Sequence, residues 1–101
     1  MKNVRVLQIA SDCKDARYRK FASLRMLNDM GIKFDISVYK EVYNGQMDVN
    51  DAEDVFVKLQ GRKPQGYEGH SLSVSDLVQI DNGDILFCDS FGFVNCKDIA
   101  E

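Results

Sequence analysis

Residues 66–93 constrain this chain most, because they read as two apolar strands joined by a tight turn. Asn82-Gly83 between those strands is the strongest short-range hairpin signal, since a two-residue loop of this kind needs a positive φ at both positions. The sequence therefore predicts a β-hairpin made of strands 72–80 and 85–90. Polar residues crowd the ends of these strands that lie away from the turn.

Counting outward from an Asn82-Gly83 loop gives a register in which Asp76 lies directly opposite Asp89. Like charges at opposed positions destabilise a sheet, and two carboxylates that close would raise the pKa of one of them. Three outcomes are open. The pair shares a proton or a cation and is functional, or a bulge near residues 73–75 turns Asp76 elsewhere. Alternatively, Asp76 accepts backbone N–H bonds from its own turn.

The N-terminal half predicts two strands around one helix. Residues 4–10 carry apolar groups on both faces, which is typical of a central strand. Over 16–30 the apolar residues recur every third position, so we expect a single helix there. Residues 33–42 alternate between apolar and polar, and Asn44-Gly45 should end this strand with a turn.

The second half adds a helix before the hairpin. Asn50 begins a capping-box pattern, and the apolar residues of 52–59 follow a helical spacing. The tail, 93–101, can add a short strand or a helical turn. The order β-α-β-α-β-β predicts an α+β fold: a small mixed sheet with two helices packed on one face and a C-terminal β-hairpin. At 101 residues, the chain is expected to be a single domain, 1–101.

The composition argues against several classes of protein. The net charge of −3 argues against a protein built mainly to hold nucleic acid, which needs clustered Lys and Arg. Cys13, Cys88 and Cys96 include no close pair, so free thiols in a reducing cytoplasm are expected rather than disulfides. The sequence has no apolar segment typical of a signal peptide and no run of about 18 apolar residues. We therefore expect a cytoplasmic protein without a membrane partner.

His70, the only histidine, lies in the approach to the third strand. Together with Asp76 and Asp89 it could form a small hydrolase or modifying site, which is the less favoured interpretation. The register places Leu77 opposite Cys88, so the thiol points away from the two carboxylates. We therefore assign no catalytic residue. Because Cys-x-x-Cys spacing is absent, no metal and no cofactor are expected.

Basic residues gather on or near the first predicted helix: Lys14, Arg17, Arg19, Lys20 and Arg25. Such a face could contact phosphate, so a nucleic-acid-associated accessory domain is the alternative function. The same run is also typical of the solvated face of a helix whose aromatic residues, Tyr18 and Phe21, belong to the core.

Two stretches of this chain resemble the signature of the YodL-like domain family. They are Gly-His-Ser-Leu-Ser-Val-Ser-Asp-Leu-Val at 69–78 and Cys-Asp-Ser-Phe-Gly-Phe at 88–93. Residues 39–45 and the acidic helix after them are similar to the segment that precedes the signature in that family. The resemblance covers roughly 34–94.

The resemblance implies a small accessory protein of a mobile genetic element in Gram-positive bacteria, and it carries over no catalytic residue. We expect a non-enzymatic interaction protein whose partner is a protein, for instance a host defence or regulatory protein, and which is a monomer or a weak dimer. The candidate binding residues cluster at the polar and aromatic end of the hairpin: Tyr67, His70, Ser71, Ser73, Asp76, Asp89, Phe91 and Phe93.

Overall fold

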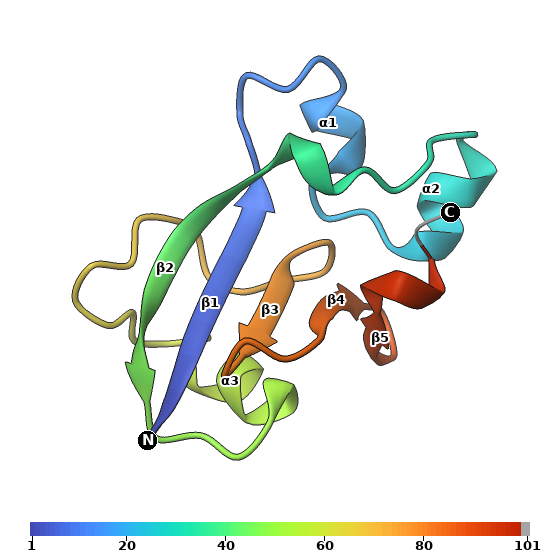
Figure 1. Cartoon of the computed structure of the whole chain (residues 1–101). Coiled ribbons are helices and arrows are strands. Elements are labelled where there is room, and N and C mark those ends of the chain that lie inside the picture. The colour runs from blue at the N-terminus through green and yellow to red at the C-terminus, as the bar shows by residue number, and fades with distance from the viewer. Residues whose placement is uncertain (100–101) are drawn as a thin grey trace.

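A computed structural model describes residues 1–99 of the chain (Figure 1). Its five-stranded sheet contains β1 (Lys2–Ile9), β2 (Tyr39–Met47), β3 (Leu77–Ile80), β4 (Ile85–Asp89) and β5 (Gly92–Asn95). The helices are α1 (Ala16–Arg19), α2 (Leu24–Asp29), α3 (Ala52–Lys58) and the 3-10 helices η1 (Ile36–Val38) and η2 (Cys96–Asp98). None of the helices in the described residues is long and apolar enough to cross a membrane.

The strands follow the order β2-β1-β3-β4-β5, so β1 has a neighbour on each side, as its two apolar faces predicted. The α+β class and the order of the predicted elements are confirmed. The pairings among the described strands are all antiparallel, where the sequence predicted a mixed sheet. Ile9 pairs with Tyr39 because the chain re-enters the sheet at the end where β1 left it. A parallel pair would need a crossover to the opposite end.

The tail contributes both of the structures that the sequence left open. β5 pairs with β4, and η2 follows it directly. The last residues of the predicted tail, 100–101, lie outside the described residues.

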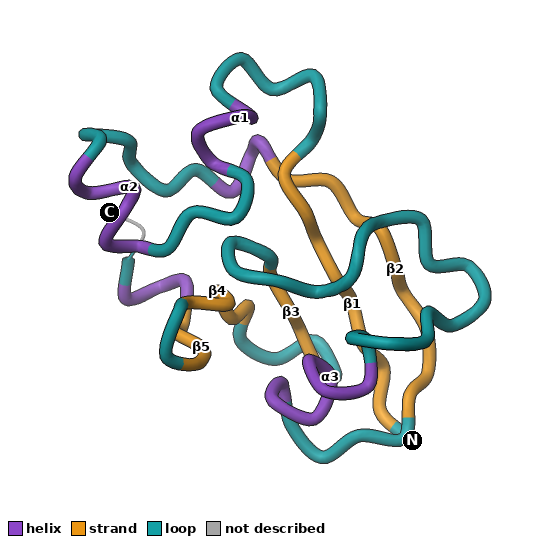
Figure 2. Tube along the Cα trace, turned by 180° about the vertical axis from the view of Figure 1, so that it is seen from behind, coloured by secondary structure: helices purple, strands orange, loops and turns teal. Residues whose placement is uncertain are grey.

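Apolar side chains pack on both faces of the sheet. On one face, Val4 and Val78 belong to a cluster with Val55 and Leu59, on α3 and at its C-terminal end. Figure 2 shows α3 and the long loop that follows it on the near side of the sheet. These residues bury one face of the central strands.

The opposite face is covered by a second cluster. Leu7 and Leu77 pack there with Phe87 and with Leu27 of α2. Successive residues of a strand point to opposite faces. The helices therefore cover both faces, and not the single face that the sequence predicted, because β1 is apolar on both sides.

The single helix predicted over 16–30 is divided into α1 and α2. Phe21 lies between them with a φ of 63°, which is outside the α-helical region. The backbone N–H of Phe21 donates to Oγ of Ser75 at 3.0 Å, so a contact from the far end of the chain stabilises the break. Ser23 then begins α2 by accepting a hydrogen bond from the backbone N–H of Met26.

The strand predicted over 33–42 begins later and ends later than expected. Asp35 accepts from the backbone N–H of Ser37 at 3.0 Å, which turns residues 36–38 into η1. β2 then continues through Asn44-Gly45, where a turn was predicted, because Gly45 pairs with Val4 of β1.

The hairpin exists, but its register differs by one residue from the prediction. The positive φ values fall on Asp81 (51°) and Asn82 (58°), not on Asn82 and Gly83. The chain turns one residue early because Asp81 still pairs with β1: its N–H donates to the carbonyl of Asn3 at 2.8 Å. Leu77 consequently faces Phe87, where the prediction had placed Cys88 opposite it.

α3 also begins with a cap that is shifted by one residue. The side chain of Asp51, not that of Asn50, accepts from the backbone N–H of Asp54 at 2.9 Å. The carboxylate of Asp54 in return accepts from the backbone N–H of Asn50 at 3.0 Å. This arrangement is a variant of the capping box, because the bond to Asp54 comes from the residue before the N-cap and not from the N-cap itself.

We predict that Asp51→Ala lowers the free energy of unfolding by about 1 kcal/mol, because it removes an N-cap acceptor. Asn50→Ala is the matched control: it should change stability by less than about 0.5 kcal/mol, since Asn50 contributes its backbone N–H to the box. Urea unfolding measures both values. A larger loss for Asn50→Ala than for Asp51→Ala would contradict the assigned cap.

Candidate functional site

A buried polar cluster surrounds Asp76, and we call it the Asp76 cluster; its members are Gln8, Tyr67, His70, Ser73 and Asp76. Asp76 is only 1% exposed. Its Oδ2 accepts from the backbone N–H of Ser73 at 2.9 Å and from Nε2 of Gln8 at 3.0 Å. Asp76 thus accepts a backbone bond from its own turn, which was one of the outcomes that the sequence left open.

Gln8 connects β1 to this cluster. Its amide nitrogen carries only two hydrogens, and its shortest contacts are the carbonyl oxygen of His70 at 2.9 Å and Oδ2 of Asp76 at 3.0 Å. Its Oε1 accepts from the backbone N–H of His70 at 3.2 Å. The side-chain amide of Gln8 therefore bonds both backbone groups of His70, as a neighbouring strand would.

His70 lies at the edge of the cluster, and its side chain is 38% exposed. Its Nδ1 is 2.8 Å from the carbonyl oxygen of Ser71, which can only accept, so Nδ1 carries the hydrogen. The same nitrogen is 3.9 Å from Oδ2 of Asp76, too far for a hydrogen bond. The ring packs against Phe21, with 5.1 Å between the ring centroids. His70 therefore serves as a cover over the buried carboxyl group.

Tyr67 also bonds the backbone of His70. Its hydroxyl donates to the carbonyl oxygen of His70 at 2.7 Å. Burial, with a smaller contribution from the charge of Asp76, raises the pKa of Tyr67 to about 12. The hydroxyl therefore remains protonated at neutral pH and can keep donating.

The carboxyl group of Asp76 is incompletely bonded. Its Oδ1 and the hydroxyl of Ser73 are buried and form no hydrogen bond within the described part of the chain. Burial raises the pKa of Asp76 to about 7, although the donors on Ser73 and Gln8 lower it in part. An unpaired buried oxygen of a carboxylate is costly, so the protonated form is favoured.

Asp76 and Asp89 do not form the opposed pair that the hairpin register predicted. The N–H of Ser75 donates to the carbonyl of Cys88, while the N–H of Cys88 donates to the carbonyl of Asp76. Two residues thus lie opposite one, and Ser75 has a φ of 88°, which makes this a β-bulge. Asp89 instead accepts from the backbone N–H of Leu24 at 3.1 Å, in the first turn of α2.

The remaining aromatic candidates lie outside the Asp76 cluster. Phe91, in the turn between β4 and β5, is 102% exposed. Phe93 is partly buried and packs against the cluster of α3. A hollow of about 300 Å³ lies between α3 and this turn, and we call it the turn groove. The residues that line it include Glu53, Phe56, Val57, Cys88, Asp89 and Phe93.

The basic residues of the N-terminal half do not share one helical face, because the helix that was to carry them is broken at Phe21. Arg19 is buried, forms an ion pair with Asp15 at 2.8 Å and donates to the carbonyl of Lys33. Arg17 lies over the ring of Tyr18, 4.7 Å from its centroid. Lys20 donates to Ser11, and Lys14 and Arg25 are exposed.

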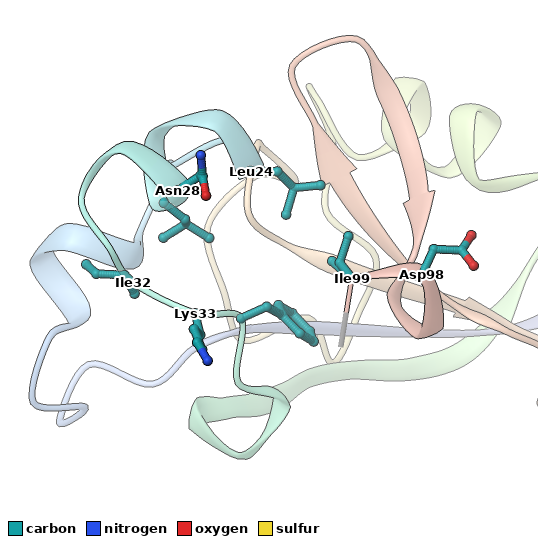
Figure 3. A pocket seen from close by; sticks show the side chains of 8 residues that line it. Leu24, Asn28, Ile32, Lys33, Asp98 and Ile99 are labelled. Atoms are coloured by element: carbon teal, nitrogen blue, oxygen red, sulfur yellow. The ribbon is translucent and has the colours of Figure 1, made fainter. Parts of the chain in front are cut away.

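A second hollow, of about 450 Å³, lies between α2, the segment that follows it and η2. Figure 3 shows Leu24 and Ile99 beside it, with the carboxylate of Asp98 pointing away from both. Among the described residues, no group of His, Cys, Asp or Glu is placed to hold a metal ion. Burial raises the pKa of Cys88 to about 11, which disfavours the nucleophilic thiolate.

Sequence reasoning missed Gln8, Gly69 and Tyr39. The available signal for Gln8 was an amide between the apolar residues Leu7 and Ile9, in a strand that the sequence already placed at the centre of the sheet. Gly69 has no room for a side chain: a Cβ there would lie 2.1 Å from Oε1 of Gln8 and 3.1 Å from Cβ of Val42. Tyr39 donates its hydroxyl to the carbonyl of Ser75 at 2.6 Å, and burial raises its pKa above the ordinary value.

We predict that Gly69→Ala destabilises the protein by about 2 kcal/mol or more, because the new methyl group displaces the buried amide of Gln8 from its partners. Gly61→Ala is the matched control, since a Cβ at Gly61 meets nothing within 4 Å. That change should be neutral or slightly stabilising. Thermal and urea unfolding measure both variants, and equal effects would contradict the packing of Gly69 against Gln8.

A second prediction concerns the pH dependence of stability. The pKa of Asp76 is raised from 3.8 to about 7, so the folded state binds its proton more tightly than the unfolded chain. Tighter binding of the proton stabilises the folded state, and this contribution to the free energy of unfolding is complete below about pH 4 and is lost as the pH rises through 7. In Asp76→Asn the side chain keeps the shape of aspartate but stays neutral at every pH. The wild type should therefore lose on the order of 2–4 kcal/mol more than Asp76→Asn between pH 4 and 8.

Urea unfolding at several pH values measures this difference, and Asp48→Asn provides a control at an exposed position. The control should follow the wild-type curve. Parallel curves for the wild type and Asp76→Asn would mean that Asp76 titrates as an ordinary exposed carboxylate.

The comparisons with known proteins agree with the resemblance drawn from the hairpin residues. The family model described as YodL-like domain matches residues 3–98. No curated protein and no solved structure matches the chain. The match extends from β1 through η2 and so includes both the Asp76 cluster and the turn groove. The chain belongs to the YodL-like domain family.

Proposed function

We propose that this YodL-like domain is a non-enzymatic interaction module that binds a protein partner through the turn between β4 and β5. The single observation that carries the proposal is Phe91, a large aromatic side chain that is 102% exposed. Aromatic residues, Phe among them, are enriched at the cores of protein interfaces relative to the rest of the protein surface. We also propose that it is an accessory protein of a mobile genetic element, the role that the resemblance to the family implied.

The surroundings of Phe91 support a binding surface. The neighbouring α3 exposes Val57, a branched apolar side chain that is 69% exposed, on the rim of the turn groove. Phe91 itself lies on a short turn between two paired strands, because Asp89 pairs with Gly92. A short turn held by paired strands presents its side chain with little conformational freedom, which reduces the entropic cost of binding.

The Asp76 cluster supports the non-enzymatic part of the proposal. The hydroxyl of Tyr67 is occupied by a backbone carbonyl, and so is Nδ1 of His70. Asp76 is 1% exposed and bonds Ser73 and Gln8. These polar groups hold the chain together, and Phe91 on the turn is the most exposed residue of the predicted site. For the partner we propose a host defence or regulatory protein, the class that an accessory protein of a mobile element meets.

We predict that Phe91→Ser abolishes the capture of a specific protein from the native host without changing stability. Affinity capture with mass spectrometry compares it with the wild type and with Ile36→Ser, an exposed apolar residue on η1 that is 45% exposed. The control should capture the same protein as the wild type. Undiminished capture by Phe91→Ser, at unchanged thermal stability, would contradict the proposal.

A further inference from the structure

We infer that the outer edge of β5 binds an extended segment of the partner protein, which pairs with β5 as an added strand of the sheet. This inference rests on the proposed function, because it names how the partner engages the region of the turn. It follows from backbone groups of β5 that point away from the rest of the sheet.

The outward groups of β5 can be identified from the strand beside it. The N–H of Cys88 donates to the carbonyl of Asp76, and the carbonyl of Cys88 accepts from Ser75, so both groups of Cys88 point toward β3. Phe93 lies opposite Cys88 and forms no bond with it, since bonded and non-bonded pairs alternate along antiparallel strands. The N–H and C=O of Phe93 therefore point away from β4, and no backbone group within residues 1–99 bonds them.

The same alternation applies to the end of β5. Asn95 lies opposite Leu86, two residues before Cys88, so the N–H of Asn95 also points outward. Among the described residues, no backbone carbonyl accepts from this N–H. The outward groups of Phe93 and Asn95 together form a template for main-chain hydrogen bonds to another extended chain.

The two edges of the sheet differ in how they are protected. On β2, the carbonyl of Val42 accepts from the N–H of Glu68 at 2.9 Å, and the side chains of Lys40 and Glu41 are exposed. Exposed charges and a covering loop discourage an edge strand from pairing with another chain. β5, Gly-Phe-Val-Asn, carries no charge, and no described strand lies beyond it in Figures 1 and 2. The unprotected edge is the one that accepts a strand.

Pairing with β5 also determines the chemistry of the partner segment. Side chains that lie opposite each other on neighbouring strands share one face of the sheet. The partner residue opposite Phe93 therefore enters the turn groove, which Phe93 lines together with Phe56 and Val57 of α3. Since these three neighbours are apolar, the segment carries an apolar side chain at that position.

Asn95→Pro blocks the edge without breaking the sheet. Asn95 has a φ of −65°, which is the angle that proline fixes, and Val94 before it lies in the strand, as the residue before proline requires. The N–H that is lost points outward, so no bond to β4 is removed. Because Oδ1 of Asn95 accepts from the N–H of Lys97, Asn95→Ala is the matched control, which loses the same cap. Thermal unfolding confirms that both variants are folded.

The probe is a displayed library of random linear dodecapeptides selected on the intact wild-type chain. Enriched peptides are synthesised, and their dissociation constants are measured by fluorescence polarisation. Asn95→Pro should weaken binding about tenfold or more relative to Asn95→Ala, because main-chain bonds supply the affinity of an added strand. N-methylation of each peptide amide in turn should weaken binding at every second residue, since alternate N–H groups of a strand point to the same neighbour.

Amide hydrogen exchange, measured by NMR, follows the edge itself. In the free protein the N–H of Phe93 should exchange about tenfold or more faster than the N–H of Val94, which lies in a bonded pair with Phe87. A bound peptide should slow the exchange of Phe93. Exchange at Phe93 that is as slow in the free protein as in the complex would contradict a free edge.

Three results would overturn the inference: selection that yields no peptide, equal binding by Asn95→Pro and Asn95→Ala, and effects of N-methylation that do not alternate. A wild-type chain that sediments as a dimer, while Asn95→Pro sediments as a monomer, would also overturn it, because a second copy would then occupy the edge. If Phe91→Ser loses its captured protein although Asn95→Pro binds the peptides normally, the interaction module stands and only the strand pairing is wrong. If neither variant changes binding, both proposals fail together.

Discussion

The buried carboxyl group of Asp76 is the constraint on which the rest of the structure depends. A carboxyl group removed from water needs donors, or it must stay protonated. Gln8 of β1 and the backbone of Ser73 supply the donors to Oδ2. Gln8 also bonds both backbone groups of His70, so the same amide attaches the long loop after α3 to the central strand.

The bulge beside Asp76 extends this constraint to the N-terminal half. Ser75 adopts a positive φ, and its side chain accepts from the backbone of Phe21 while its carbonyl accepts from Tyr39. Phe21 also has a positive φ, and its ring covers His70. The two residues with a positive φ, Ser75 and Phe21, are thus joined to each other by a hydrogen bond. The break between α1 and α2 is therefore a consequence of tertiary contacts made more than fifty residues away.

This dependence explains which parts of the fold could be predicted from the sequence. The central position of β1 and the existence of α3 follow from local patterns of apolar residues, and both are correct. The hairpin was also predicted, but its register depends on Asp81, which pairs with Asn3 of β1. The residues around the turn do not reveal that Asp81 pairs with a strand near the start of the chain. A shift of one residue moves side chains to the other face, and so the predicted opposition of Asp76 and Asp89 was lost with it.

The predicted site divides into two parts with different roles. His70 and Asp76 belong to a network that organises the backbone, whereas Phe91 projects fully into solvent. A polar signature in a sequence can therefore mark the groups that hold a loop in place. Under the proposed function, the binding surface lies beside that network, on the turn that follows β4, and α3 supplies the opposite wall of its groove.

The most direct test of this account is the titration of the Asp76 carboxyl carbon by carbon-13 NMR, assigned with Asp76→Asn. The account predicts a midpoint near pH 7, because burial raises the pKa of Asp76 to about 7. A midpoint near pH 4, the ordinary value for an exposed aspartate, would contradict the buried network at the centre of the fold.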